Sequence, residues 1–167
     1  MVSISPAGSV EDFEIAAGLC SALADWDASE APPYGISPDE VRALFHGETA
    51  ASLRAKYNSA DSRLFIARSD GSPAGCFAFS PFDETTVEFH KFFVDGRLRG
   101  RGIGSLLMRT VLAEAQKGYR RTAFIHTTVY MTGAISIYRS FDFIYCPPFR
   151  PTPEHIRHTD VFMSRRI

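Results

Sequence analysis

Apolar residues recur three and four positions apart along several stretches of the chain, a spacing that places side chains on one face of a helix. Over residues 10–26 these positions include Phe13, Ala16, Cys20 and Leu23. Ser37-Pro38 has the form of an N-cap with proline at the first helical position. The expected helices cover residues 10–26, residues 38–46 with room for more helix up to 57, a segment from residue 103, and residues 132–140.

Other stretches are rich in β-branched and aromatic residues and are bounded by turn residues, which predicts strands. Ser69-Asp70-Gly71-Ser72 supplies a tight hairpin turn between two of them. From residue 87 to 128 a strand, a glycine loop, a helix and a strand imply a right-handed crossover with parallel pairing. The expected strands cover residues 2–4, 63–68, 74–79, 85–94, 121–128, 143–145 and 159–164. The fold class is α+β, a mainly antiparallel sheet with flanking helices in one domain over residues 1–167.

The loop Arg99-Gly100-Arg101-Gly102-Ile103-Gly104-Ser105 joins a strand to a helix. Glycine lets successive amides turn inward, and a helix N-terminus adds unpaired N–H groups and partial positive charge, so the loop predicts a phosphate-bearing ligand. It has no lysine where a nucleoside triphosphate loop needs one. Ser105 stands where a dinucleotide fingerprint needs glycine. ATP hydrolysis and hydride transfer are therefore disfavoured.

The segment after the loop predicts a helix that packs on the sheet. Its apolar face comprises Ile103, Leu106, Leu107, Thr110, Val111 and Ala115. Gly118 follows where a C-cap is expected. Further on, the proline-rich segment from Cys146 to Pro153 predicts a surface loop.

Composition narrows the class of partner. The chain has 18 basic and 19 acidic residues, and its net charge of −1 predicts no general attraction to nucleic acid or to an anionic membrane. Three widely spaced cysteines favour neither a disulfide framework nor a zinc site, and a reducing cytoplasm is the expected compartment. Neither a basic leader with an apolar run nor a membrane-length apolar stretch is present, so secretion and membrane insertion are not expected.

Three motifs follow one another between residues 88 and 143. They are a strand from Glu88 to Asp95, the loop from Arg99 to Gly104, and Ala134-Ile135-Ser136-Ile137-Tyr138-Arg139-Ser140-Phe141-Asp142-Phe143. In this order they resemble the GNAT N-acetyltransferases, with their fourth strand, their Arg/Gln-x-x-Gly-x-Gly/Ala loop and their Ala-Ile-x-Leu-Tyr-x-x-x-Gly-Phe segment. The resemblance is clear from Leu64 to the C-terminus and only architectural over the first sixty residues.

The resemblance implies a sheet of about six or seven strands with about four helices, in which the fourth and fifth strands splay apart to receive acetyl-CoA. The pantetheine arm would pair with exposed strand backbone, and the pyrophosphate would rest on the loop amides near the arginine side chains. No metal is required. The cofactor-binding residues would be Phe92, Phe93, Val94, Arg99, Gly100, Arg101, Gly102, Ile103, Gly104 and Ser105.

The resemblance also implies direct transfer to a primary amine of a small molecule, amino acid or peptide. Glu88 matches the strand glutamate used as a base in some members, and strand alternation would place it on one face with His90 and Phe92. His90 is the competing base, since its ordinary pKa lies nearer neutrality. Glu88 could instead be a solvent-facing or salt-bridged strand residue. Tyr138 matches the tyrosine that gives a proton to the departing CoA thiolate.

The chain departs from the family pattern at two positions. Met131 stands where many members have an asparagine that contacts pantetheine. Asp142 replaces the usual glycine, and a left-handed turn is still expected there. Cys146 is expected to be a small buried residue and not a nucleophile.

The choice of acceptor depends on the regions of the chain that the resemblance matches poorly. Candidates for an acceptor pocket are Trp26, Pro32-Pro33-Tyr34 and the Phe149-Arg150 loop. The sequence leaves open whether the protein forms a homodimer. Two other classes also remain, a non-catalytic acyl-CoA sensor on the same fold and a nucleotide-binding or kinase-like protein. The sensor would keep the glycine loop without needing Glu88 or Tyr138.

Overall fold

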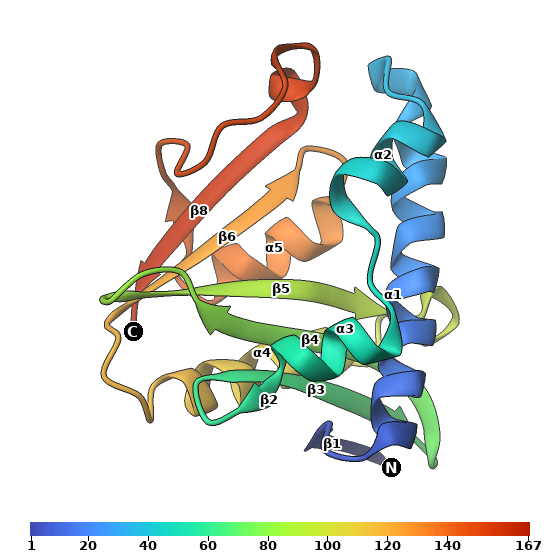
Figure 1. The fold of residues 1–167 in the computed structure, drawn as a ribbon, viewed down its shortest axis with the longest axis vertical. Coiled ribbons are helices and arrows are strands. Elements are labelled where there is room, and N and C mark those ends of the chain that lie inside the picture. The colour runs from blue at the N-terminus through green and yellow to red at the C-terminus, as the bar shows by residue number, and fades with distance from the viewer.

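An open, mostly antiparallel sheet forms the centre of the computed structural model, which describes residues 1–167 (Figure 1). The strands lie in the order β1-β3-β4-β5-β6-β8-β7, with β2 paired to the start of β3. Every neighbouring pair is antiparallel except β5 and β6, which are parallel, as the crossover predicts. The strands are β1 (Val2–Pro6), β2 (Asn58–Ser59), β3 (Ser62–Ser69), β4 (Ser72–Pro81), β5 (Thr86–Val94), β6 (Thr122–Thr128), β7 (Ile144–Tyr145) and β8 (Asp160–Arg166).

Five α-helices cover the two faces of the sheet (Figure 1). Side chains of α1 and α3 pack with Leu64 and Ile66 on one face, and side chains of α4 and α5 pack with Phe65 and Ala67 on the other. Alternation along β3 therefore feeds two separate cores. None of the helices is long and apolar enough to cross a membrane. They are α1 (Val10–Glu30), α2 (Pro38–Phe45), α3 (Ala50–Lys56), α4 (Ile103–Ala115) and α5 (Thr132–Ser140), with short 3-10 helices at Pro32–Tyr34, Gly96–Leu98 and Glu154–Thr159.

The local signals explain most element boundaries. Ser37 caps α2 by accepting a hydrogen bond from the Glu40 amide, as predicted. Asp70 and Gly71 take φ values of 50° and 83°, the left-handed backbone that a two-residue hairpin turn between β3 and β4 requires. The strand and helix counts exceed the expectation because of the two-residue strand β2 and the short helix α3.

The prediction of Gly118 as the C-cap of the glycine-loop helix was wrong. Helix α4 ends at Ala115, and its C-cap is Gln116 in right-handed conformation. The amides of Gln116 and Gly118 bond to the carbonyls of Leu112 and Ala115 at 3.0 and 3.2 Å. This tight turn satisfies the last carbonyls of the helix, so no left-handed glycine is needed.

A β-bulge at Lys91 breaks the alternation of β5. Cys76 pairs with Phe93 but Ala78 pairs with His90, so β5 carries one extra residue between these pairs, and Lys91 has a φ of 59°. The expectation that Phe92 shares a face with Glu88 and His90 was therefore wrong. The Phe92 ring lies on the opposite face, with its centroid 4.8 Å from that of Phe77.

The parallel pairing of β5 and β6 is short. It joins Thr86–Phe89 to Thr122–Ile125, and residues 90–94 of β5 have no partner on the β6 side. The two strands diverge beyond this point, which confirms the splay expected for this fold. The opening lies between α1 and α5, and the glycine loop follows at the end of β5 (Figure 1).

Candidate functional site

The divergence of β5 and β6 leads into a cleft of about 510 Å³. Its wall is formed by the end of β5, the glycine loop, the start of α5 and the end of α1. Arg101 is exposed and does not line the cleft. The nine other residues predicted to bind the cofactor do line it, namely Phe92, Phe93, Val94, Arg99, Gly100, Gly102, Ile103, Gly104 and Ser105.

The glycines of the loop have distinct structural reasons. Gly100 and Gly102 take φ values of 78° and 77°, a left-handed backbone that other residues adopt at a cost. Gly104 is needed for close packing, since a Cβ there would stand 2.7 Å from Ile137 Cδ1 and 3.1 Å from Phe92 Cζ. Gly102 is the N-cap of α4 and no side chain caps the helix, which leaves its first amides free to bind an anion.

The Arg99 side chain extends from the loop and contacts both the end of β5 and helix α1. Its Nε donates to the Val94 carbonyl at 3.2 Å, and its guanidinium stands 5.3 Å from the ring centre of Trp26. Trp26 is the single tryptophan of the chain. It lines this cleft, whereas we expected it in an acceptor pocket. Its fluorescence therefore provides an intrinsic probe of ligand binding here.

A second, smaller hollow of about 170 Å³ adjoins the cleft, and the two share Leu23, Phe92 and Met131 as lining residues. Both predicted catalytic residues, Glu88 and Tyr138, line this hollow together with the competing base His90. Arg150, named as a candidate for the acceptor pocket, lines it as well. Phe149 instead stacks on Phe124 with ring centres 4.3 Å apart.

Glu88 is an almost fully buried carboxylate at 5% exposure. Its Oε2 forms an ion pair with Arg150 Nη2, and His90 Nε2 lies 3.9 Å from the same oxygen. The interpretation of Glu88 as a salt-bridged strand residue is thus confirmed, but the ion pair lies inside the hollow and not on the outer surface. Arg150 reaches it from the loop between β7 and β8.

His90 is held in its neutral form by its surroundings. Burial, followed by the positive charges of Lys56, Lys91 and Arg150, lowers the pKa of His90 well below its usual 6.5. Its Nε2 lies 2.9 Å from Ser80 Oγ. The reduced proton affinity of His90 and the contact of one of its nitrogens with Ser80 both weaken it as a candidate for the base.

Tyr138 projects from α5 into the core. Its ring packs against Phe92 and Phe143, with centroid distances of 5.6 and 6.2 Å. Burial raises the pKa of Tyr138 well above its ordinary value of 10.0. Its hydroxyl makes no hydrogen bond within the chain and keeps its proton at neutral pH. It is therefore available as a proton donor.

Comparisons with known proteins agree with this geometry. The model of the acetyltransferase (GNAT) family matches residues 21–143. The chain belongs to the GNAT family.

Individual relatives are distant from this GNAT protein. It is 34% identical over 86 residues to an uncharacterized N-acetyltransferase of Methanocaldococcus jannaschii, a match that spans 48% of this chain but only 38% of the relative. A GNAT-family acetyltransferase of Streptococcus pneumoniae superposes with a TM-score of 0.74 at 18% identity, covering 100% of this chain and 99% of the other. A GNAT-family acetyltransferase of Elizabethkingia anophelis, solved with acetyl-CoA bound, gives a TM-score of 0.59 at 18% identity, covering 99% and 98%.

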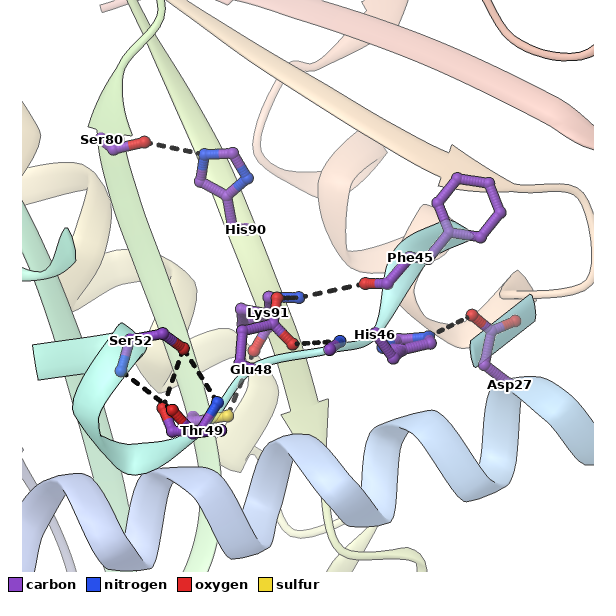
Figure 2. A network of polar contacts seen from close by, with 11 residues as sticks. Asp27, Phe45, His46, Glu48, Thr49, Ser52, Ser80, His90 and Lys91 are labelled. Carbon is purple, nitrogen blue, oxygen red and sulfur yellow. Dashed lines mark hydrogen bonds and ion pairs between the residues drawn. The ribbon is translucent and has the colours of Figure 1, made fainter. Parts of the chain in front are cut away.

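Sequence reasoning missed a set of buried polar contacts on the connection between α2 and α3 (Figure 2). Lys91 forms an ion pair with Glu48 and donates to the Phe45 carbonyl at 3.4 Å. His46 Nε2 lies 2.7 Å from Asp27 Oδ2, and Asp27 also accepts the hydroxyl of Tyr130. The one available signal was Asp27 itself, a carboxylate on the apolar stripe of α1.

The two departures from the GNAT pattern are tolerated locally. Met131 lines both hollows, and Thr127 Oγ1 donates to its sulfur at 3.1 Å. Asp142 takes the expected left-handed conformation, with a φ of 65°.

Cys146 is partly exposed and lines neither hollow, so the expectation that it is buried was wrong. No group of three or more His, Cys, Asp or Glu side chains could hold a metal ion.

The lowered pKa of His90 predicts a pH dependence of stability. Below pH 6.5, the ordinary pKa of histidine, His90 is protonated in the unfolded chain but stays neutral in the folded protein. The free energy of unfolding therefore falls as pH falls. Between about pH 6.5 and 5.5 the native protein should lose about 1 kcal/mol more than the His90→Gln variant. Urea denaturation at the two pH values measures the difference. Equal losses in both proteins would show that His90 titrates normally.

Proposed function

We propose that this protein is an N-acetyltransferase that moves the acetyl group of acetyl-CoA directly to a primary amine of a small molecule, amino acid or peptide. The observation that carries the proposal is the junction of the two hollows. A cleft with the glycine loop at its wall adjoins a smaller hollow that is lined by a buried carboxylate and a neutral phenol, and the two share three lining residues. A donor site and an acceptor site are therefore adjacent, as transfer within a ternary complex requires.

The cleft fits a donor that carries a pyrophosphate and a long, uncharged arm. The free amides at the start of α4 suit the pyrophosphate, and Arg99 adds a charged donor. The unpartnered β6 side of β5, over residues 90–94, suits an arm that pairs as an added strand. Acetyl-CoA would supply an acetyl group activated as a thioester.

We assign the proton transfers to two of the residues that line the smaller hollow, Glu88 and Tyr138. Glu88 takes a proton from the amine as the carbon–nitrogen bond forms. A backbone N–H near Val94 polarises the carbonyl. Tyr138 gives a proton to the sulfur as the carbon–sulfur bond breaks, and its raised pKa keeps that proton in place until then. A non-catalytic acyl-CoA sensor would need neither side chain.

The donor site is tested by Gly102→Glu. The φ of Gly102 strains any other residue, and the added carboxylate repels a pyrophosphate, so binding of acetyl-CoA should be lost. Isothermal titration calorimetry and Trp26 fluorescence measure the loss, with ATP as the control ligand. Gly71→Glu is the matched variant, since it has the same charge and a φ of 83° but does not line the cleft. Micromolar affinity retained by Gly102→Glu would contradict the anion-binding role of the loop.

The base is tested by Glu88→Gln with a panel of amines, scored by release of CoA. Turnover should fall by about a hundredfold or more near neutral pH. The loss should shrink toward about pH 9, where an α-amino group with a pKa of about 8 is already free. Glu14→Gln, a change at an exposed glutamate of α1, should behave as the native protein. An unchanged pH–rate profile in Glu88→Gln would assign the base elsewhere.

The proton donor is tested by Tyr138→Phe. The phenol makes no hydrogen bond within the chain, so the fold and the affinity for acetyl-CoA should persist while kcat falls about a hundredfold. Steady-state kinetics and calorimetry separate the two effects. Tyr119→Phe, at a tyrosine with 68% exposure, serves as the control. Native kcat in Tyr138→Phe would reject the assignment.

A further inference from the structure

Charged groups of both signs surround Glu88. Lys56, Lys91 and Arg150 are the cations close enough to influence one another, and the carboxylates among them are Glu48 and Glu88. Asp27, another carboxylate lining the smaller hollow, is engaged by His46 and Tyr130. His126, which also lines it, lies 2.9 Å from Asp160. With Asp27 counted, the three cations stand beside three carboxylates, and a carboxylate that enters the hollow must share a cation with one of them.

Arg150 is the cation best placed to meet such a group. Lys91 is fixed by Glu48 and the Phe45 carbonyl (Figure 2). The Arg150 side chain is 37% exposed, stands on a loop without helix or strand, and has a single hydrogen bond, the one to Glu88. A guanidinium carries five N–H donors in a planar fork. Most of its donors are therefore free at the wall of the hollow.

We propose that the amine acceptor carries a carboxylate close to its reactive nitrogen, and that Arg150 binds this carboxylate. This inference rests on the proposed function. The incoming carboxylate competes with Glu88 for the guanidinium and forms a bidentate pair with it. Glu88 is thereby released beside the amine that it must deprotonate. Arg150 is a substrate-binding residue, and its exchange of partners couples recognition of the acceptor to the availability of the base.

The geometry also limits the size of the acceptor. Because Arg150 touches Glu88, the carboxylate and the amine that approach this pair are separated by only a few bonds. The hollow of about 170 Å³ is smaller than the roughly 300–1,000 Å³ of pockets for drug-sized ligands. A free amino acid with its amine α or β to the carboxylate meets both conditions. The N-terminus of a long peptide has no carboxylate at that spacing.

The test compares free amino acids with the corresponding amino acid amides, using acetyl-CoA and release of CoA. The native protein should favour the acids, although the amine of an amide is less basic and more of it is free at neutral pH. In Arg150→Gln the ratio of kcat/KM for acid over amide should fall about 10–100-fold, mainly through KM of the acid. The ratio cancels any effect of the variant on Glu88 itself. Arg109→Gln, at an exposed arginine of α4, should retain the native ratio.

An acid-to-amide ratio that is the same in the native protein and in Arg150→Gln would overturn the inference. Preference for amides or for peptide N-termini in the native protein would overturn it as well. Both results leave the proposed function intact, since an amine is acetylated. Binding of acetyl-CoA without release of CoA for any amine would instead refute the proposed function. Failure of the inference and failure of the function are therefore distinct outcomes.

Discussion

One residue held in left-handed backbone inside a strand determines the geometry on which both hollows depend. Lys91 has a φ of 59°, a conformation that costs about 1–3 kcal/mol for a residue with a side chain. The surroundings offset this cost, because Lys91 pairs with Glu48 and its carbonyl accepts a hydrogen bond from Cys76 Sγ at 3.2 Å. The bulge turns Phe92 toward α5 and Phe93 toward α1. The pairing of β5 with β6 ends at Phe89, just before the bulge, so β5 has no partner on that side from residue 90 onward.

Polar contacts attach the segment between α2 and α3 to this bulge. The Lys91–Glu48 and His46–Asp27 pairs lie in partly or fully buried surroundings, where an unpartnered charge would be costly (Figure 2). An apolar contact tolerates sliding, whereas the Lys91–Glu48 pair fixes the segment relative to β5 and the His46–Asp27 pair fixes it relative to α1. The part of the wall of the smaller hollow that Phe45 and His46 provide is therefore positioned in part by the lysine at the bulge.

The parts of the fold that sequence predicted are those fixed by local signals. Helix α5 lies at residues 132–140 as expected, and the glycine loop lies at the cleft because left-handed glycines and a free helix N-terminus are local properties. The side of the strand that Phe92 occupies was mispredicted, because a bulge depends on the register of β4 against β5. The pairing of Glu88 with Arg150 joins residues 62 positions apart, and no local pattern specifies it.

This long-range pair explains how one carboxylate can be buried in the fold and still be available for the role that we propose for it. At 5% exposure, the Glu88 carboxylate has lost most of its hydration, and without a cation no ion pair would offset that cost. A fully buried partner would stabilise the carboxylate but would hold it permanently. Arg150, on a loop with part of its side chain in solvent, stabilises the carboxylate and leaves room for exchange. In this site the requirement of stability, that the charge be paired, is therefore compatible with the proposed role of Glu88 as the base, which needs a pairing that can be replaced.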